Sequence, residues 1–132
     1  MGGIGRIWLA FAGINAAFAV GASAYASHAL AAPGLEKAQE WVRTAGQFQL
    51  WHALALVAVL LLAARTEGAA RLAVRAAGWL FLAGMVLFCG TLYALALQVA
   101  LPLPNSAPTG GTALMAGWAV LALAAVLPGW RR

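Results

Sequence analysis

Long apolar stretches separated by short clusters of charged residues dominate this chain. Three stretches contain no Asp, Glu, Lys or Arg, and they cover residues 7–35, 44–64 and 76–130. A helix needs about 20 apolar residues to cross the hydrocarbon core of a bilayer. The first two stretches suffice for one crossing each, and the third suffices for two. The pattern therefore predicts helices that span a membrane.

The third stretch is interrupted at residues 101–111, which read LPLPNSAPTGG. Its prolines lack amide donors and its glycines allow positive φ angles, so the chain is expected to turn there. Short connections make successive spans antiparallel, and the predicted fold is a single all-α integral membrane domain over residues 1–132, an up-down four-helix bundle. The four predicted spans cover residues 7–30, 44–64, 74–99 and 112–127.

Two alternatives bear on these spans. β-Barrels also cross membranes, but their strands alternate apolar and polar residues, whereas these runs are continuously rich in Ala and Leu. Helices are therefore the prediction. The first span also has the features of a cleavable signal peptide, namely Arg6, an apolar run at residues 8–20 and the small residues 22–24. That second alternative stays open.

A short additional helix is predicted between the first two spans, at residues 33–43. The apolar residues of this segment fall at positions i, i+3, i+6 and i+7, with charged residues on the opposite face. Such spacing is typical of an amphipathic helix at the membrane interface. A solvated loop is the alternative. The apolar residues are Leu35, Ala38, Trp41 and Val42.

The composition supports a membrane protein and excludes several other classes. The 132 residues are 64% hydrophobic and only 8% charged, which lies far outside the range of soluble domains and disordered chains. Cys89 is the only cysteine, so no intrachain disulfide can form. The net charge of +5 does not indicate nucleic-acid binding, because the cations flank the apolar runs and form no continuous basic patch. The expected partner is the lipid bilayer.

The positions of the cations predict an orientation. Six of them fall on one side of the four spans, against Lys37 and Arg43 on the other. Because cytoplasmic segments are enriched in Lys and Arg, both termini are predicted to be cytoplasmic. Trp8 is one of five tryptophans expected at the two membrane interfaces. The six cations are Arg6, Arg65, Arg71, Arg75, Arg131 and Arg132.

Small residues mark the expected helix contacts. Helices in a bilayer associate through close backbone approach and interhelical hydrogen bonds, since lipid tails are as apolar as leucine. In the first span, glycine and alanine recur every four residues and so share one helix face. Faces of this kind also permit a homodimer or assembly into a larger membrane complex. The predicted packing positions are Gly13, Ala17, Gly21, Gly84, Gly90 and Gly117.

Neutral polar side chains inside the spans are the candidates for function, because such side chains are costly in hydrocarbon. With a rise of about 1.5 Å per residue, they are predicted to form one polar layer in the outer half of the bundle. The candidates for this layer, or for a ligand site built from it, are His28, Gln47, Gln49, His52, Thr91 and Tyr93.

Three uses of this layer stay open. Interhelical hydrogen bonding that fixes helix register, in an accessory or assembly component of the membrane, is the leading interpretation. The others are a small-molecule or proton role, as in a carrier or channel, and metal or haem binding. A catalytic zinc normally takes three protein ligands, whereas the chain has two histidines and Cys89. Apart from Arg75 at the start of the third predicted span, the spans carry no charged residue. We therefore expect no catalytic residue, no metal site, no cofactor and no enzymatic activity.

Several strings together resemble one family of small membrane proteins. The segment TAGQFQLWHAL at residues 44–54 is similar to the T-A-x-x-Y-Q-x-x-H-A-L segment of the YgdD-like proteins, which include relatives of the eukaryotic transmembrane protein 256. FCGTLY at residues 88–93 resembles the F-S-G-S-L-Y of that family. PTGG at residues 108–111, followed by Gly-Trp at 117–118, resembles its P-x-G-G-x5-G-W.

The chain departs from the family pattern at three places. SAYASH at residues 23–28 keeps the histidine of the family's G-A-F-G-A-H but replaces both glycines, Phe48 replaces a tyrosine, and Cys89 replaces a serine. The resemblance implies a four-helix protein of the bacterial inner membrane. It implies no reaction, because the family is described as a domain of unknown function.

Overall fold

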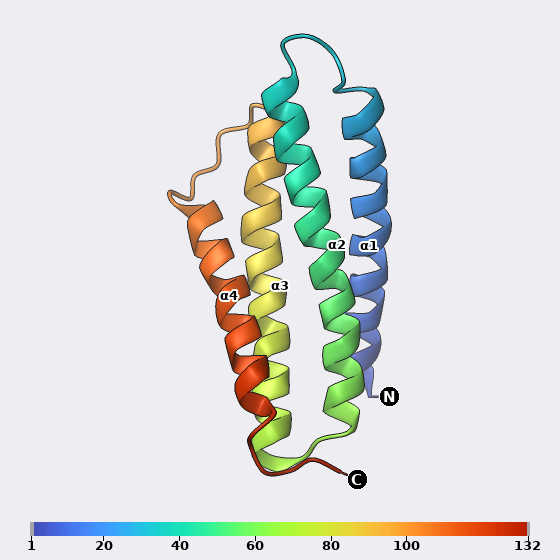
Figure 1. Cartoon of the computed structure of the whole chain (residues 1–132), viewed down its shortest axis with the longest axis vertical. Coiled ribbons are helices and arrows are strands. Elements are labelled where there is room, and N and C mark those ends of the chain that lie inside the picture. Colours follow the sequence, from blue (N-terminus) through green and yellow to red (C-terminus); the bar gives the residue numbers. More distant parts are fainter. Residues whose placement is uncertain (1, 132) are drawn as a thin grey trace.

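The computed structural model describes residues 2–131 and contains four long helices in that range (Figure 1). Each helix is long and apolar enough to cross a membrane. Successive helices run antiparallel, and both ends of the chain lie at the same end of the molecule, here called the terminal end. The prediction of an all-α, up-down four-helix membrane protein is confirmed. The helices are α1 (Gly3–His28), α2 (Glu36–Ala64), α3 (Gly68–Ala96) and α4 (Ser106–Ala124).

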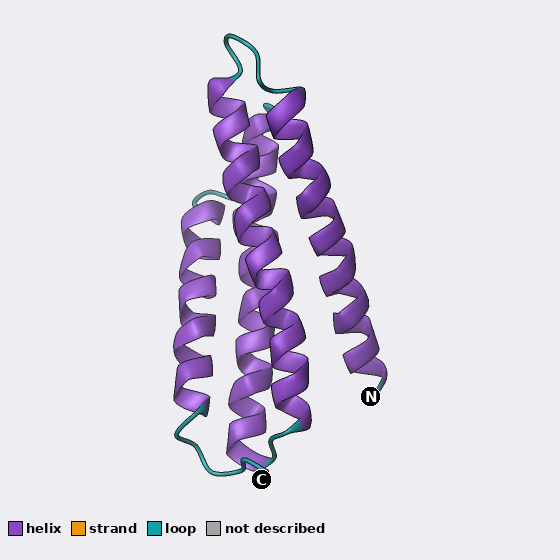
Figure 2. Cartoon of the chain, turned by 45° about the vertical axis from the view of Figure 1, so that its right-hand side comes forward, coloured by secondary structure: helices purple, strands orange, loops and turns teal. Residues whose placement is uncertain are grey.

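The helices pack in the order of the sequence, so α2 and α3 occupy the middle of the bundle. Backbone contacts join α1 to α2, α2 to α3 and α3 to α4. Within residues 2–131, α1 meets α3 only through side chains. Trp8 lies edge-on to Trp79 with ring centroids 5.0 Å apart, and Phe18 lies edge-on to Tyr93 at 5.4 Å. Figure 2 shows α1 inclined away from the other helices toward its N-terminus.

Two local predictions are wrong. No separate interfacial helix follows the first span, because α2 runs unbroken from Glu36 through Arg43 and no Pro or Gly stands between them to end a helix. The predicted turn at residues 101–111 is also too long. Helix α4 already begins at Ser106, since Pro108 falls in its first turn, where the missing amide proton has no helical partner to lose.

Glycines of α3 and α4 allow these helices to approach closely. A Cβ atom on Gly84 would lie 2.7 Å from the Leu114 side chain, and one on Gly117 would lie 2.6 Å from the Phe81 ring. Gly78 likewise lies under the Trp8 indole, and Trp8 is buried between the helices.

The other predicted packing positions do not contact neighbouring helices within the described chain. Three of these positions share a face of α1 that is exposed. α1 packs instead through alanines spaced seven residues apart, a spacing that returns to the same helix face after two turns. A Cβ atom on Gly90 of α3 would also meet no atom within 4 Å. The exposed positions are Gly13, Ala17, Gly21 and Gly90, and the packing alanines are Ala12, Ala19 and Ala26.

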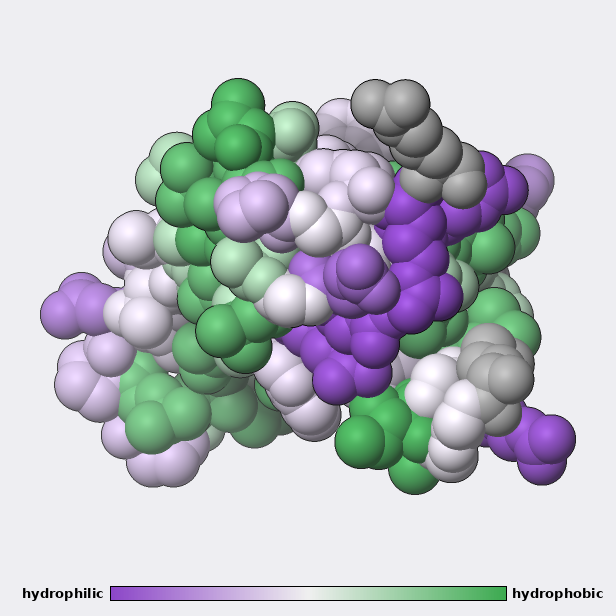
Figure 3. Space-filling view, turned by 90° about the horizontal axis from the view of Figure 1, so that it is seen from below, coloured by the Kyte–Doolittle hydropathy of each residue, from purple (hydrophilic) through white to green (hydrophobic). Residues whose placement is uncertain are grey.

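The C-terminal segment holds the α2–α3 connection at the terminal end. The Glu67 amide donates to the Gly129 carbonyl at 2.7 Å, and the Arg131 amide donates to the Arg65 carbonyl at 3.0 Å. Arg131 also forms an exposed ion pair with Glu67 at 3.2 Å. Figure 3 shows hydrophilic residues gathered over this end. Arg132, which contributes to the predicted orientation, lies outside the described residues.

Candidate functional site

Helix α2 points its polar side chains into the bundle because its buried residues follow a helical period. Gln49 and His52 are three residues apart, and both side chains are buried. They lie 13 and 16 residues after the first residue of this 29-residue helix. The polar contacts of α2 therefore sit near the middle of the helix.

A relay of side-chain hydrogen bonds joins α3, α2 and α1 at this depth. The Tyr93 hydroxyl donates to Oε1 of Gln49 at 2.7 Å. Nε2 of Gln49 donates to Oδ1 of Asn15 at 2.7 Å, and Nδ2 of Asn15 donates to the Phe11 carbonyl at 2.9 Å. That carbonyl can only accept, so it fixes both amide orientations and makes Tyr93 the first donor of the relay.

His52 connects α2 to α4. Its Nδ1 lies 2.7 Å from the Phe48 carbonyl, and its Nε2 lies 3.1 Å from Nε1 of Trp118. A carbonyl only accepts and an indole N–H only donates, so the neutral imidazole with its proton on Nδ1 satisfies both contacts. The aromatic rings of Phe81 and Trp118 surround the imidazole, at centroid distances of 5.4 and 6.0 Å.

Thr91 joins α3 to the start of α4. Its hydroxyl lies 2.7 Å from the Ser106 hydroxyl and 2.6 Å from the Leu87 carbonyl. Ser106 is buried, and it is the first residue of α4. This contact therefore fixes where α4 begins against α3.

The structure brings together only part of the predicted layer. Gln49 and Tyr93 share the relay, whereas His52 and Thr91 form two separate contacts with α4. His28 is the exposed last residue of α1, and Gln47 is exposed on α2. These two residues do not join the layer, because their positions on the helices turn them away from the neighbouring spans.

Three partners escaped the sequence analysis. Asn15 stands alone as an amide in an apolar run, and that isolation is a signal that could have identified it. Trp118 offers no such signal, because its role depends on the indole reaching a histidine 66 residues earlier in the chain. Ser106 sat inside the predicted turn, so its burial could not be anticipated.

The two ring nitrogens of His52 leave this side chain little capacity for metal or haem binding. Within residues 2–131, no group of three or more His, Cys, Asp or Glu side chains comes together. Both nitrogens of His52 are engaged, and an iron or zinc ion on Nε2 would have to displace the Trp118 indole. The arrangement suits hydrogen bonding between helices.

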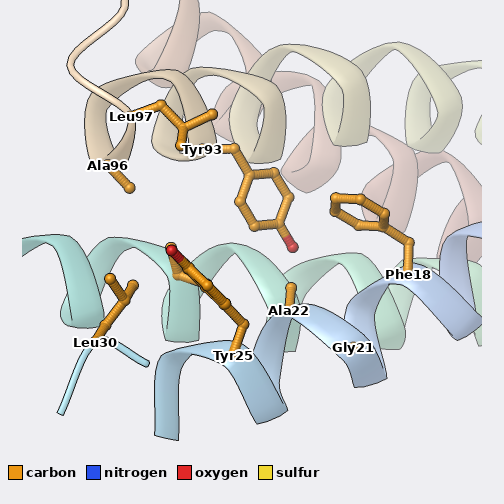
Figure 4. Close-up of a pocket in the computed structure, with 9 residues that line it drawn as sticks. Phe18, Gly21, Ala22, Tyr25, Leu30, Tyr93, Ala96 and Leu97 are labelled. Atoms are coloured by element: carbon orange, nitrogen blue, oxygen red, sulfur yellow. The ribbon is translucent and has the colours of Figure 1, made fainter. Parts of the chain in front are cut away.

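A groove between α1 and α3 consists of two neighbouring compartments, which share the edge-on rings of Phe18 and Tyr93 in their lining. Its inner compartment measures about 330 Å³ and includes Asn15, Gln49 and Gly90 in its lining. Its outer compartment measures about 390 Å³ and lies between residues such as Gly21 and Leu97. Phe18 and Tyr93 line both compartments. Figure 4 shows Tyr25 and Phe18 of α1 and Tyr93 of α3 around the outer compartment. We call both compartments together the α1–α3 groove.

The sequence matches a known family over more than half of its length. Residues 22–111 fit the model of a family described as "Protein of unknown function (DUF423)". The chain belongs to this family. The DUF423 match covers α2, α3 and the Tyr93–Gln49 hydrogen bond between them, as well as the connection to α4.

Relatives of this DUF423 protein are membrane proteins of bacteria. The UPF0382 membrane protein YwdK of Bacillus subtilis is 36% identical over 121 residues, which cover 92% of this chain and 97% of the relative. A UPF0382 membrane protein of Haemophilus influenzae is 36% identical over 93 residues, with 70% and 72% coverage. One of Staphylococcus epidermidis is 32% identical over 121 residues, with 92% and 96% coverage. No solved structure matches the chain.

Proposed function

We propose that this protein is a non-enzymatic accessory or assembly component of the bacterial inner membrane. Its polar side chains fix the register of the four helices, and its partners are other membrane proteins or a second copy of the chain. Within its family we place it in the YgdD-like group, on the strength of the strings at residues 44–54, 88–93 and 108–111.

The mutual pairing of the mid-depth polar groups carries this proposal. A catalytic or metal-binding group needs an unoccupied atom to present to its substrate or ion. Here the His52 ring uses both nitrogens within the protein, which leaves it no free atom for an ion or a substrate. The space between these contacts is filled by buried side chains such as Phe81 and Leu56, which argues against a water-filled channel.

The charges at the two ends support the proposed orientation, with both termini in the cytoplasm. Five described arginines lie on the terminal end or in the helix turns next to it, whereas Lys37 and Arg43 at the opposite end stand beside Glu36 and Glu40. The excess of cations favours a cytoplasmic terminal end. The five arginines are Arg6, Arg65, Arg71, Arg75 and Arg131.

Single-cysteine labelling tests the orientation. With Cys89 replaced by serine, Ala32→Cys in the α1–α2 connection should react with a membrane-impermeant maleimide on intact spheroplasts. Ala69→Cys at the terminal end should react only after the membrane is permeabilised. The reverse pattern would place both termini outside and overturn the orientation.

Native purification tests the function. Protein isolated in mild detergent should carry no Soret band and less than stoichiometric metal, and defined membrane proteins should co-elute with it. Bound haem, or one equivalent of metal that is lost in His52→Leu and kept in the exposed control Gln47→Leu, would overturn the proposal in favour of a carrier. Elution without any protein partner, as a monomer, would overturn the assembly role.

A further inference from the structure

The polar relay at the floor of the α1–α3 groove retains hydrogen-bonding capacity that the protein does not use. Nδ2 of Asn15 and Nε2 of Gln49 each donate one of their two N–H groups. The Tyr93 oxygen donates its proton to Gln49, so its lone pairs can still accept. Among the described residues no further partner contacts these atoms. All three side chains line the inner compartment.

This spare capacity lies where water cannot satisfy it. Asn15 is 12 residues from the first residue of the 26-residue α1, which places it near the middle of a span. An amide or hydroxyl without a partner is destabilised in hydrocarbon, and lipid tails offer no partner. A ligand that fills the groove and completes these hydrogen bonds is therefore favoured over lipid tails.

The chemistry of the floor selects a hydroxyl group. A hydroxyl can accept a hydrogen bond from the amide of Asn15 or Gln49 and donate its own proton to the Tyr93 oxygen. A carbonyl could accept but would leave the Tyr93 lone pairs without a donor. No Lys or Arg lines either compartment, so an ionised carboxylate or phosphate would be buried there without a counter-charge.

The outer compartment provides room for an apolar tail. Its lining is aliphatic and aromatic and includes Leu30, Val42 and Leu97. The two compartments of about 330 and 390 Å³ each fall within the range of small-molecule sites. Gly21 and Gly90 line one compartment each, and a Cβ atom on either would meet nothing within 4 Å.

We propose that the α1–α3 groove binds a neutral single-chain amphiphile, with its hydroxyl group on Asn15, Gln49 and Tyr93. Its apolar tail passes along the open side of the Phe18 and Tyr93 rings into the outer compartment. The ligand class is a long-chain alcohol or a lipid that presents one hydroxyl in the same way. This inference goes beyond the assembly role and does not depend on it.

Photolabelling of the whole chain in phosphatidylcholine nanodiscs tests this proposal. The probe is a hexadecanol that carries a diazirine on its tail, and mass spectrometry maps its attachment sites. Label should concentrate on residues that line the outer compartment. Unlabelled hexadecanol should compete at least about tenfold better than hexadecane or hexadecanoic acid, because the alkane forms no hydrogen bond and the acid brings an unpaired charge.

Three glycine variants give a matched comparison. Gly90→Leu fills the inner compartment and Gly21→Leu fills the outer one, and each should reduce labelling about tenfold or more. Gly13→Leu is the control, because Gly13 is equally open and exposed on α1 but lines neither compartment. Tyr93→Phe removes the hydroxyl and should reduce the advantage of hexadecanol over hexadecane by about threefold to tenfold.

Several results would overturn the proposal. Equal labelling of Gly90→Leu, Gly21→Leu and Gly13→Leu would show only contact with bulk lipid. Hexadecane that competes as well as hexadecanol would show that the floor does not select a hydroxyl, and this competition needs only the wild-type chain. Stronger competition by hexadecanoic acid would identify a charged ligand. The assembly role is tested by co-elution, so each proposal can fail without the other.

Discussion

The hydrogen bond between His52 and Trp118 should be measurable as a coupling energy between α2 and α4. Nε1 of Trp118 and Nε2 of His52 are 3.1 Å apart, near the long end of the range for this bond. His52 is 4% exposed and Trp118 is 49% exposed. Interhelical hydrogen bonds in membrane proteins average about 0.6 kcal/mol and reach about 1.7 kcal/mol. We expect a coupling of about 1 kcal/mol.

Each single variant should cost more than the bond itself. His52→Leu leaves the indole N–H without a partner, and Trp118→Phe leaves the imidazole lone pair unpartnered in the core, so each should lower the free energy of unfolding by about 1–2 kcal/mol. The double variant should cost about 1 kcal/mol less than the sum of the two, because the second substitution has no bond left to break. Unfolding by SDS in mild detergent micelles, followed by circular dichroism, supplies the four energies.

A second indole provides the control. Trp130→Phe also removes an N–H donor, which binds the Ala124 carbonyl at 2.9 Å, but Trp130 lies in the C-terminal segment at the terminal end. Its effect should add to that of His52→Leu within about 0.5 kcal/mol. If the cycle with Trp118 is equally additive, the histidine does not hold α4 in register and the leading interpretation of the polar side chains is wrong.

Three further predictions concern single positions. Gln49→Leu breaks contacts to two helices and should lower the free energy of unfolding by about 1–3 kcal/mol, whereas exposed Gln47→Leu should change it by less than about 0.5 kcal/mol. Gly84→Leu should lower the free energy of unfolding by about 1–3 kcal/mol or more through overpacking against α4. Gly90→Ala should instead raise it by up to about 1 kcal/mol, because alanine favours the helix more than glycine does. Thermal melts in detergent compare the two variants. Gly129 has φ of 116° and its Cβ would overlap a carbonyl of the α2–α3 connection, so Gly129→Ala should release the C-terminal segment and speed amide hydrogen exchange there. Slow exchange in that variant would refute the argument.

The number and type of the helices could be predicted from the sequence because hydrocarbon imposes a simple length requirement. An uncharged apolar run of sufficient length has few alternatives to a spanning helix. Helix ends are a different matter. α2 begins at Glu36, before its apolar run, because a helix can continue into the interface where charged side chains are hydrated. Charge spacing locates the membrane crossing and leaves the length of the helix undetermined.

The partners of the polar side chains could not be predicted, because they depend on the rotation of each helix about its axis. Gln49 forms a hydrogen bond with Asn15, which lies 34 residues earlier in the chain, and another with Tyr93, which lies 44 residues later. Trp8 shows the same limit for an aromatic residue. Its indole is amphipathic enough for an interface, and it is buried only because Gly78 on α3 leaves space for the ring.

The neutral polar contacts also determine how α1 is held. α1 packs its backbone on α2 alone, and three side-chain contacts fix it along its length: Trp8 over Gly78 near its start, Asn15 to Gln49 at its middle, and the Ala26 carbonyl accepting from Nε2 of Gln39 at 2.8 Å near its end. Apolar packing against α2 would tolerate small shifts along the helix axis, because lipid and leucine are interchangeable neighbours. A directional hydrogen bond does not tolerate them. The position of α1 along α2 is therefore determined by polar residues, of which Asn15 is marked in the sequence only as an isolated exception in an apolar run.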